Sequence, residues 1–331
     1  MSEENNKKEE AAKRALESKD AINRPSVPET SEEVSNMEAV IDSQGLGKVS
    51  MGSFNPPKAA PSDDLLGWHI ENLDNLPSKG KFYPSNTIIK IRSAKAAEIR
   101  HFSTMDDNNY IDMEDKLNAI VESCAMIMSG DRRLSYKDIL EEDRIVLLLS
   151  IRDLTFPEPE NKLILKGRTK KGKKSVDIEL ATKNLVPTII EPEIEKYYNS
   201  GERIYTIQTR SAGEIRMKPP TIGVMEEVTA YLQDRQEKEV ELDKAFIQVL
   251  PYIVSDWRGL SLAKIFQLEV DYKGWDDRKY MIVYRLAEKM RIGVQTTLET
   301  EIDGETATAP LDFPGGIKSL FIISDLSAEL L

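Results

Sequence analysis

The stretch LPSKGKFYP, residues 76–84, holds side chains that could bind a phosphate group. A Lys-Gly-Lys triplet occupies residues 79–81, and Ser78 places a hydroxyl directly before it. Nucleotide-binding loops combine backbone N–H groups near glycine with a lysine and a following hydroxyl residue. Here Phe82 follows the second lysine, so a Walker-type phosphate loop is excluded. The two prolines instead predict a bounded turn that leads into a strand.

The aromatic residues of this turn allow two interpretations. Phe82 and Tyr83 either pack into the core or offer an anchor to a partner, because large rigid rings concentrate binding energy. Trp257 and Trp275 are candidates for the same role in the second half of the chain. We therefore predict these four residues as partner-binding candidates, and the sequence alone leaves the choice between packing and contact open.

No set of residues predicts catalysis or metal binding. Ser135 and Ser261 each precede an apolar helical pattern, which is typical of helix N-caps, and neither has a histidine nearby to act as a base. The chain has one cysteine, Cys124, and two histidines, His69 and His101, which cannot form a disulfide or a Cys/His zinc site. We expect no catalytic residue, no metal and no cofactor.

A basic run in the middle of the chain suggests an alternative function. It could contact several phosphates of a nucleic acid at once. A solvated hairpin tip is the competing interpretation, because lysines commonly protect exposed strand edges and the run contains no aromatic side chain for base stacking. The net charge of −12 also argues against a broad nucleic-acid surface. The run consists of Lys166, Arg168, Lys170, Lys171, Lys173 and Lys174.

The composition divides the chain into an arm and a foldable part. Residues 1–62 are polar and rich in mixed charges, so they predict a disordered N-terminal arm. The longest apolar run, Ile145 to Leu149, is far too short to span a membrane, and no secretion signal is recognisable at the N-terminus. A reducing compartment is consistent with the single cysteine.

The foldable part contains a repeated pattern. The segment that begins IKIRSAKAAEIRHF at Ile89 resembles IRMKPPTIGVMEEV at Ile215, and RRLSYKDI at Arg132 resembles RGLSLAKI at Arg258, with the same offset of 126 residues. Each copy continues into a helical run and a hairpin with a glycine at its turn. We predict an α+β fold with two diverged copies of a strand, helix and hairpin module, spanning residues 63–186 and 187–331.

Several of these segments together resemble a known family. The stretch LPSKGKFYP, the segments IRSAKAAEI and NNYIDMEDKLNAIVESC, and the helical run ending SIRDLTF resemble baseplate hub proteins of T-even-like contractile-tailed bacteriophages. The resemblance covers residues 73–156 well and the second half only in layout. Many relatives carry a Cys-x-x-Cys pair in the hairpin after the long helix, where this chain has KGRTKKGKK, so no zinc knuckle is expected here.

The resemblance implies a structural or assembly duty in the tail baseplate and no known chemistry. We therefore predict a non-enzymatic protein of a contractile phage tail baseplate hub, which acts through contacts with other tail and hub proteins. The expected location is the virion tail baseplate, or the host cytoplasm during tail assembly. The alternative is a nucleic-acid-associated protein that uses the hairpin from Lys166 to Lys174.

Overall fold

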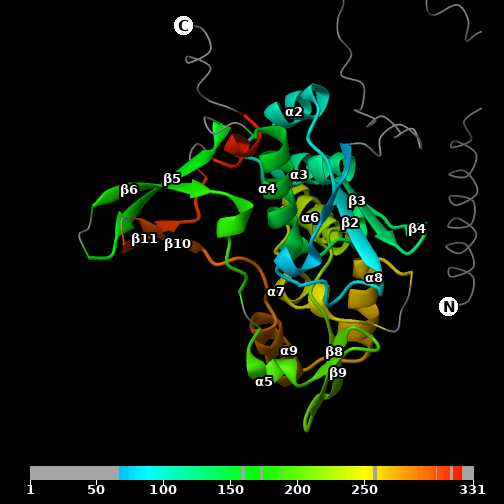
Figure 1. The fold of residues 1–331 in the computed structure, drawn as a ribbon. Coiled ribbons are helices and arrows are strands. Elements are labelled where there is room, and N and C mark those ends of the chain that lie inside the picture. Colours follow the sequence, from blue (N-terminus) through cyan, green and yellow to red (C-terminus); the bar gives the residue numbers. More distant parts are fainter. Residues whose placement is uncertain are drawn as a thin grey trace, which may run out of the picture. The chain divides into compact units, whose positions relative to one another are not determined.

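The computed structural model of the protein describes residues 67–157, 161–171, 174–188, 190–255, 259–302, 304–313 and 316–322. The predicted arm, residues 1–62, lies outside these ranges, as do Trp257 and Lys173. All of the described residues belong to one compact unit. Within them the fold is mixed α+β, with three antiparallel sheets placed around a group of helices (Figure 1).

The first sheet contains the strand that the sequence predicts after LPSKGKFYP. Its order is β1 (His69–Glu71), β2 (Thr87–Ile91), β3 (Ala125–Ser129) and β4 (Arg132–Arg133). Alternate residues of β2 are buried, and Ile89 lies opposite Ile127 of β3. One face of the sheet therefore packs inward, as the alternation of apolar residues in the sequence indicates.

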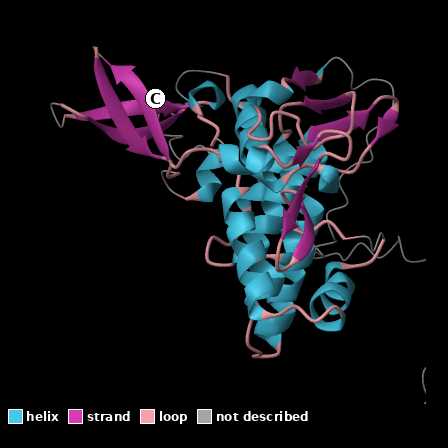
Figure 2. Cartoon of the chain, turned by 90° about the horizontal axis from the view of Figure 1, so that it is seen from below, coloured by secondary structure: helices cyan, strands magenta, loops and turns pink. Residues whose placement is uncertain are grey.

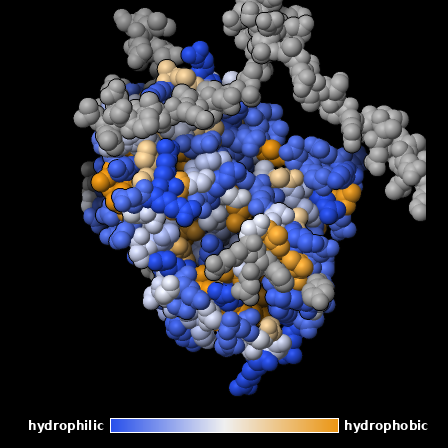
Figure 3. Space-filling view, turned by 90° about the vertical axis from the view of Figure 1, so that its right-hand side faces the viewer, coloured by the Kyte–Doolittle hydropathy of each residue, from blue (hydrophilic) through white to orange (hydrophobic). Residues whose placement is uncertain are grey.

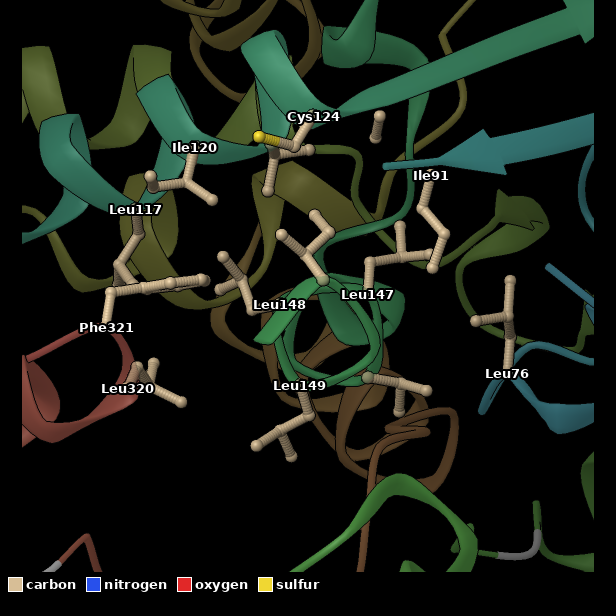
Figure 4. Packing of buried hydrophobic residues seen from close by; sticks show 14 of the residues in the cluster. Leu76, Ile91, Leu117, Ile120, Cys124, Leu147, Leu148, Leu149, Leu320 and Phe321 are labelled. Atoms are coloured by element: carbon tan, nitrogen blue, oxygen red, sulfur yellow. The ribbon is translucent and has the colours of Figure 1, made fainter. Parts of the chain in front are cut away.

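A helix that is buried around most of its circumference occupies the centre of the fold. It is α4 (Glu141–Thr155), and it is accompanied in this half by the short turn η3 (Leu73–Asn75), α2 (Ala96–Ser103), α3 (Tyr110–Cys124) and η4 (Tyr136–Asp138). Leu147, Leu148 and Leu149 are consecutive and all nearly inaccessible to solvent. Figure 4 shows these side chains pointing in different directions from α4, toward Ile91, Ile120 and Leu320 among others. Such a helix needs partners on every side.

The second half has a smaller core of its own. The helices of this half and the strands of its own sheet are α5 (Pro192–Glu195), β7 (Tyr198–Asn199), β8 (Ile204–Thr209), β9 (Gly213–Met217), α6 (Ile222–Glu237), α7 (Lys244–Gln248), η7 (Leu250–Tyr252), α8 (Leu262–Phe266), the π-helix η8 (Gln267–Tyr272) and α9 (Asp277–Lys289). The turn η9 (Ile317–Leu320), at the end of the described chain, packs instead in the core around α4. The sheet order is β7, β8, β9. Tyr205, Met217 and Val283 are fully buried where this sheet meets α9.

The two predicted hairpins join into one sheet. They are β5 (Leu163–Thr169) with β6 (Ser175–Leu180), and β10 (Thr297–Ile302) with β11 (Glu305–Pro310). The order is β10, β11, β5, β6, and Ala307 of β11 lies opposite Thr169 of β5. Figure 2 shows the strands of this sheet to one side of the helices. Its buried residues, such as Leu165 and Leu298, belong to the same core as α4.

The hairpin sheet contains strands from both sides of the predicted domain boundary. Described residues on both sides of residues 186 and 187 share the core around α4, because β10, β11 and η9 come from the second half of the chain. The division into residues 63–186 and 187–331 thus stays a prediction. Within the described residues, the two halves are joined by common packing and not only by the chain.

The predicted repeat has matching and differing parts. β9 follows β2 by 126 residues at both ends, and α6 begins 126 residues after α2. Arg92 N–H donates to the carbonyl of Cys124 at 3.0 Å, and Lys218 N–H donates to the carbonyl of Tyr252 at 2.9 Å. Beyond these elements the halves differ, since α3 has 15 residues whereas α7 has 5.

A close approach between helices fastens the two halves together. Ile222 N–H donates to the carbonyl of Ile139 at 2.8 Å, and Glu141 N–H donates to the carbonyl of Pro220 at 3.1 Å. Gly223 lies so near η4 that a Cβ atom there would stand 2.8 Å from the Cβ of Lys137. Glycine is therefore required at this position for a steric reason, although alanine favours helices more.

We predict that Gly223→Ala destabilises the protein by about 1–3 kcal/mol, because the added methyl group forces α6 away from η4. Urea unfolding would measure the change. Gly67→Ala is the control, since a Cβ at Gly67 would meet no atom within 4 Å. If Gly223→Ala were as stable as the control or more stable, the gain in helix propensity would outweigh the steric cost of the added methyl group. The close approach of α6 to η4 would then not require glycine.

Candidate functional site

The loop LPSKGKFYP uses its own backbone donors internally. Lys79 N–H donates to the carbonyl of Leu76 at 2.9 Å, Lys81 N–H to the carbonyl of Ser78 at 3.1 Å, and Gly80 N–H to Ser78 Oγ at 3.1 Å. A phosphate site of the loop type needs such N–H groups to be free and convergent. The geometry therefore agrees with the exclusion of a phosphate loop from the sequence.

A buried carboxylate holds the loop in place. Asp143, in the first turn of α4, accepts from Ser78 N–H at 2.9 Å, from Ser78 Oγ at 2.6 Å and from Tyr83 OH at 2.7 Å. The Tyr83 oxygen accepts in turn from Leu140 N–H at 3.0 Å, so its own proton must point to Asp143. Burial raises the pKa of Asp143, whereas these hydrogen bonds favour its ionised form. Every contact fits Asp143 as an acceptor.

This network decides between the two interpretations of the aromatic residues in the loop. Tyr83 is only 4% exposed and its hydroxyl is fully used, so it is a packing residue and offers no free ring to a partner. Phe82 packs edge-on against Tyr198, with ring centroids 5.7 Å apart, and also contacts Tyr205 at 5.8 Å. The loop thus joins α4 in the first half to β7 and β8 in the second.

The lysine of the loop strengthens the same joint. Lys81 forms an ion pair with Glu195, and its Nζ lies 4.0 Å from the centroid of the Tyr198 ring. Tyr198 OH donates to the carbonyl of Lys81 at 2.5 Å. The side chain that suggested phosphate binding is therefore engaged by an acidic residue and an aromatic ring of the second half.

The tryptophan candidates remain only partly located. Trp275 is partly buried and packs against the core of the second half, with Lys279 Nζ 4.9 Å from its ring centroid. Its Nε1–H is buried and has no hydrogen-bond acceptor. Trp257 lies outside the described residues. The structure does not bring Phe82, Tyr83 and Trp275 together into one exposed aromatic patch.

The serines act as the sequence predicts. Ser135 Oγ accepts from Lys137 N–H at 3.2 Å, and Asp138 completes the capping box, while Ser261 Oγ accepts from Lys264 N–H at 3.4 Å. Cys124 is completely buried, and burial raises its pKa to about 12, so it is no reactive thiol. The N-cap prediction is confirmed at both serines.

Glu142, in the first turn of α4, has a carboxyl group with a strongly raised pKa. Burial, together with the charges of Glu141 and Asp143, raises its pKa to about 8. The residue is partly exposed, but its Oε2 is buried and has no hydrogen-bond partner. Perturbed carboxyl groups often mark active sites. Glu142 instead faces the Tyr252 and Arg291 side of the second half and lines neither of the surface clefts described below.

Acidic side chains pair with two residues of the basic hairpin. Lys166 pairs with Asp177 at 2.6 Å, and Lys170 pairs with Glu299 of β10 at 2.9 Å. The exposed residues Arg168, Lys171 and Lys174 belong to the same hairpin. Acidic residues of β6 and β10 therefore neutralise two of the basic side chains and reduce the attraction of the hairpin for phosphates.

A groove lined by both apolar and polar residues lies where the N-terminus of α3 approaches the C-terminal end of α6. It has a volume of about 940 Å³. Tyr110, Val240 and Leu242 line it and are 49%, 45% and 45% exposed. We call this set the α3–α6 groove. Figure 3 shows, on one face of the molecule, how small apolar patches stand among mostly hydrophilic residues.

Sequence reasoning missed the residues of this groove and of the buried network. Asp143 is one of three acidic residues that open α4, and in a sequence all three resemble ordinary first-turn acids. Tyr110 follows the N-cap Asn109, and Val240 and Leu242 lie in the irregular connection between α6 and α7. The only available signal was the presence of large apolar residues at positions that do not continue a helical pattern.

Comparison with protein-family models, with curated proteins and with solved structures found no match for this chain. Over the ranges that the structure describes, no helix has both the length and the apolar character needed to cross a membrane. In the same ranges, no three His, Cys, Asp or Glu side chains are grouped so that they could share a metal ion.

We predict that Tyr83→Phe lowers the free energy of unfolding by about 1–3 kcal/mol, because it leaves Leu140 N–H buried without an acceptor and removes one of the two hydrogen bonds to Asp143 Oδ2. Tyr197→Phe removes a hydroxyl from a residue that is 36% exposed and serves as the control. Urea unfolding of the two variants would compare them. Equal stabilities would contradict the role of the Asp143 network.

A second prediction concerns pH. The native pKa of Glu142 is about 8, above the ordinary value of about 4.3 in an unfolded chain. The folded state therefore binds more protons between these values, and stability falls as pH rises through this window. Glu142→Gln should remove the dependence, so its melting temperature should exceed that of the wild type by about 3 °C or more at pH 9 and by little at pH 4. Parallel melting curves for both chains would contradict this.

Proposed function

We propose that this protein is a non-enzymatic structural or assembly protein of a contractile phage tail baseplate hub, and that it acts by binding other tail and hub proteins. The observation that carries the proposal is the α3–α6 groove, where large apolar side chains stay exposed beside one another. Its proposed occupant is another hub protein. The protein would act in the virion tail baseplate, or in the host cytoplasm during tail assembly.

The lining of the groove supports a protein contact. The apolar side chains of Tyr110, Val240 and Leu242 are accompanied by amide side chains and by charged ones. The polar residues include Asn109, Gln236, Arg235, Glu237 and Glu239. A centre of aromatic and aliphatic residues with a polar rim is the usual composition of a protein interface. Isolated apolar residues on a surface are ordinary, but several around one hollow are typical of a binding site.

The chemistry of the described side chains supports a role without catalysis. Ser135 and Ser261 are engaged as caps, and the Cys124 thiol is buried. Tyr83 and Asp143 bind each other. Groups of the kinds that enzymes use as nucleophiles or bases are thus employed here in holding elements together.

We also propose that the two halves of the fold descend from one duplicated unit. The matched bounds of β2 and β9, the matched starts of α2 and α6, and the serine caps at an offset of 126 residues support this. The isolated bridge between Met217 and Ile253 corresponds to the pairing of Ile91 with Ala125. A duplicated unit would give a hub protein two related surfaces on one chain.

The nucleic-acid alternative has less support. Two of its basic residues, Lys166 and Lys170, are paired with Asp177 and Glu299, and the chain as a whole is acidic. A weak electrostatic attraction to phosphates would then rest on Arg168, Lys171, Lys173 and Lys174.

We predict that replacing Val240 and Leu242 with serine weakens co-purification with hub proteins about tenfold or more, since apolar anchors at the centre of an interface carry most of its energy. Met281→Ser on α9 is the control, because Met281 is equally exposed at 44% but lies outside the groove. Circular dichroism would confirm that both variants stay folded.

Deletion of the gene from a phage that carries it gives a second measurement of the same prediction. Electron microscopy should show incomplete baseplates, and the wild-type gene supplied in trans should restore them, whereas the groove variant should not. Normal tails together with impaired DNA replication or packaging would contradict the baseplate function and favour the nucleic-acid alternative.

A further inference from the structure

A second cleft lies beside α4, between the edges of two sheets. It has a volume of about 740 Å³ and is lined on one side by all of β1 and on the other by Glu179 of β6 and the turn that follows. Ser150 and Asp153 of α4 contribute to its lining. We call it the β1 cleft.

The outer edge of β1 has no strand beside it. β1 is the outermost strand of its sheet, and its inner edge pairs with β2, where Ile70 lies opposite Lys90. No other described strand pairs with β1. Such an edge presents N–H and C=O groups to which an extended segment can add as a further strand. Ile70 is 70% exposed, so an added strand would also cover an apolar side chain.

The charges of the cleft determine what kind of segment fits. Four carboxyl groups line it, against two lysines, and they belong to Glu71, Asp74, Asp153 and Glu179. Asp153 Oδ2 accepts from Thr182 N–H at 3.3 Å and from Thr182 Oγ1 at 3.0 Å, but Asp153 Oδ1 is buried and has no donor. A buried acceptor without a donor costs free energy that an incoming cation would recover.

Glu71 is a second carboxyl group in the cleft that a cation would stabilise. Burial raises its pKa, and the hydrogen bonds from Ser150 and Asn75 offset this only in part. A lysine or arginine beside Glu71 would favour the ionised form of this carboxyl group. A second copy of this chain fits poorly, because the chain carries a net charge of −12.

We infer that the β1 cleft receives an extended, arginine- or lysine-containing segment of a partner protein, which pairs with the free edge of β1 and places a basic side chain at Asp153. Backbone hydrogen bonds to β1 supply affinity, and the carboxylates supply selectivity for basic over acidic segments. This contact uses a surface separate from the α3–α6 groove and does not depend on the phage assignment.

The probe for this inference is a short fluorescein-labelled peptide of alternating valine and arginine, titrated into the full chain and followed by anisotropy. We expect binding that is about tenfold tighter than that of a valine and glutamate peptide. An arginine peptide N-methylated at every second residue should bind about tenfold more weakly, because it lacks the N–H groups of one edge. Hydrogen exchange should slow at the β1 amides when the peptide binds.

Matched variants locate the contact. Asp153→Asn should weaken peptide binding about tenfold. Asp177→Asn removes a carboxylate from the exposed side of β6, outside the β1 cleft, and should leave binding unchanged. Equal losses in both variants would reduce the effect to general charge attraction and overturn the inference.

Three further results would also overturn it. The first is no binding of the arginine peptide, and the second is equal binding of its N-methylated form, which would exclude strand addition. The third is protection of the β1 amides in the chain alone that disappears with Asp153→Asn, since a segment of the chain itself would then occupy the cleft.

Discussion

The buried carboxylate of Asp143 is the interaction on which the arrangement of the two halves depends. A carboxylate without water must be surrounded by donors, and the donors here come from Ser78 and Tyr83, in a loop far away in the sequence. Once the loop is held on α4, Phe82 and Lys81 necessarily face the second half, where they meet Tyr198 and Glu195. One buried charge thus positions a loop, and the loop positions a neighbouring sheet.

The central helix imposes a second constraint. Because α4 buries leucine side chains in several directions, one sheet and one pair of helices do not cover it, and β10, β11 and η9 from the far end of the chain share its core. The hairpins consequently pair with each other in one sheet and not within separate modules. Gly223 permits the remaining close contact, between α6 and η4. Internal repetition in the sequence and mutual packing in the fold are therefore compatible.

The same packing brings charged side chains together. Lysines of the loop and hairpin that suggested phosphate or nucleic-acid contacts are paired with acids that folding brings beside them, as Lys81 is with Glu195 and Lys170 with Glu299. What stays open is of another kind, a groove with exposed apolar side chains between two helix ends and a strand edge beside carboxylates. These are the two surfaces that we propose for contacts with other polypeptides.

The sequence by itself determined the local features, because their interactions span only a few residues. The N-caps at Ser135 and Ser261, the strand from Thr87 to Ile91 and the glycine turn at Gly304 all depend on neighbours along the chain. Only the tertiary structure decided what Tyr83 does, since its acceptor Asp143 lies 60 residues away. The same holds for both clefts. Their walls come from elements that are distant in sequence, and no local pattern records which edges and helix ends will stand side by side.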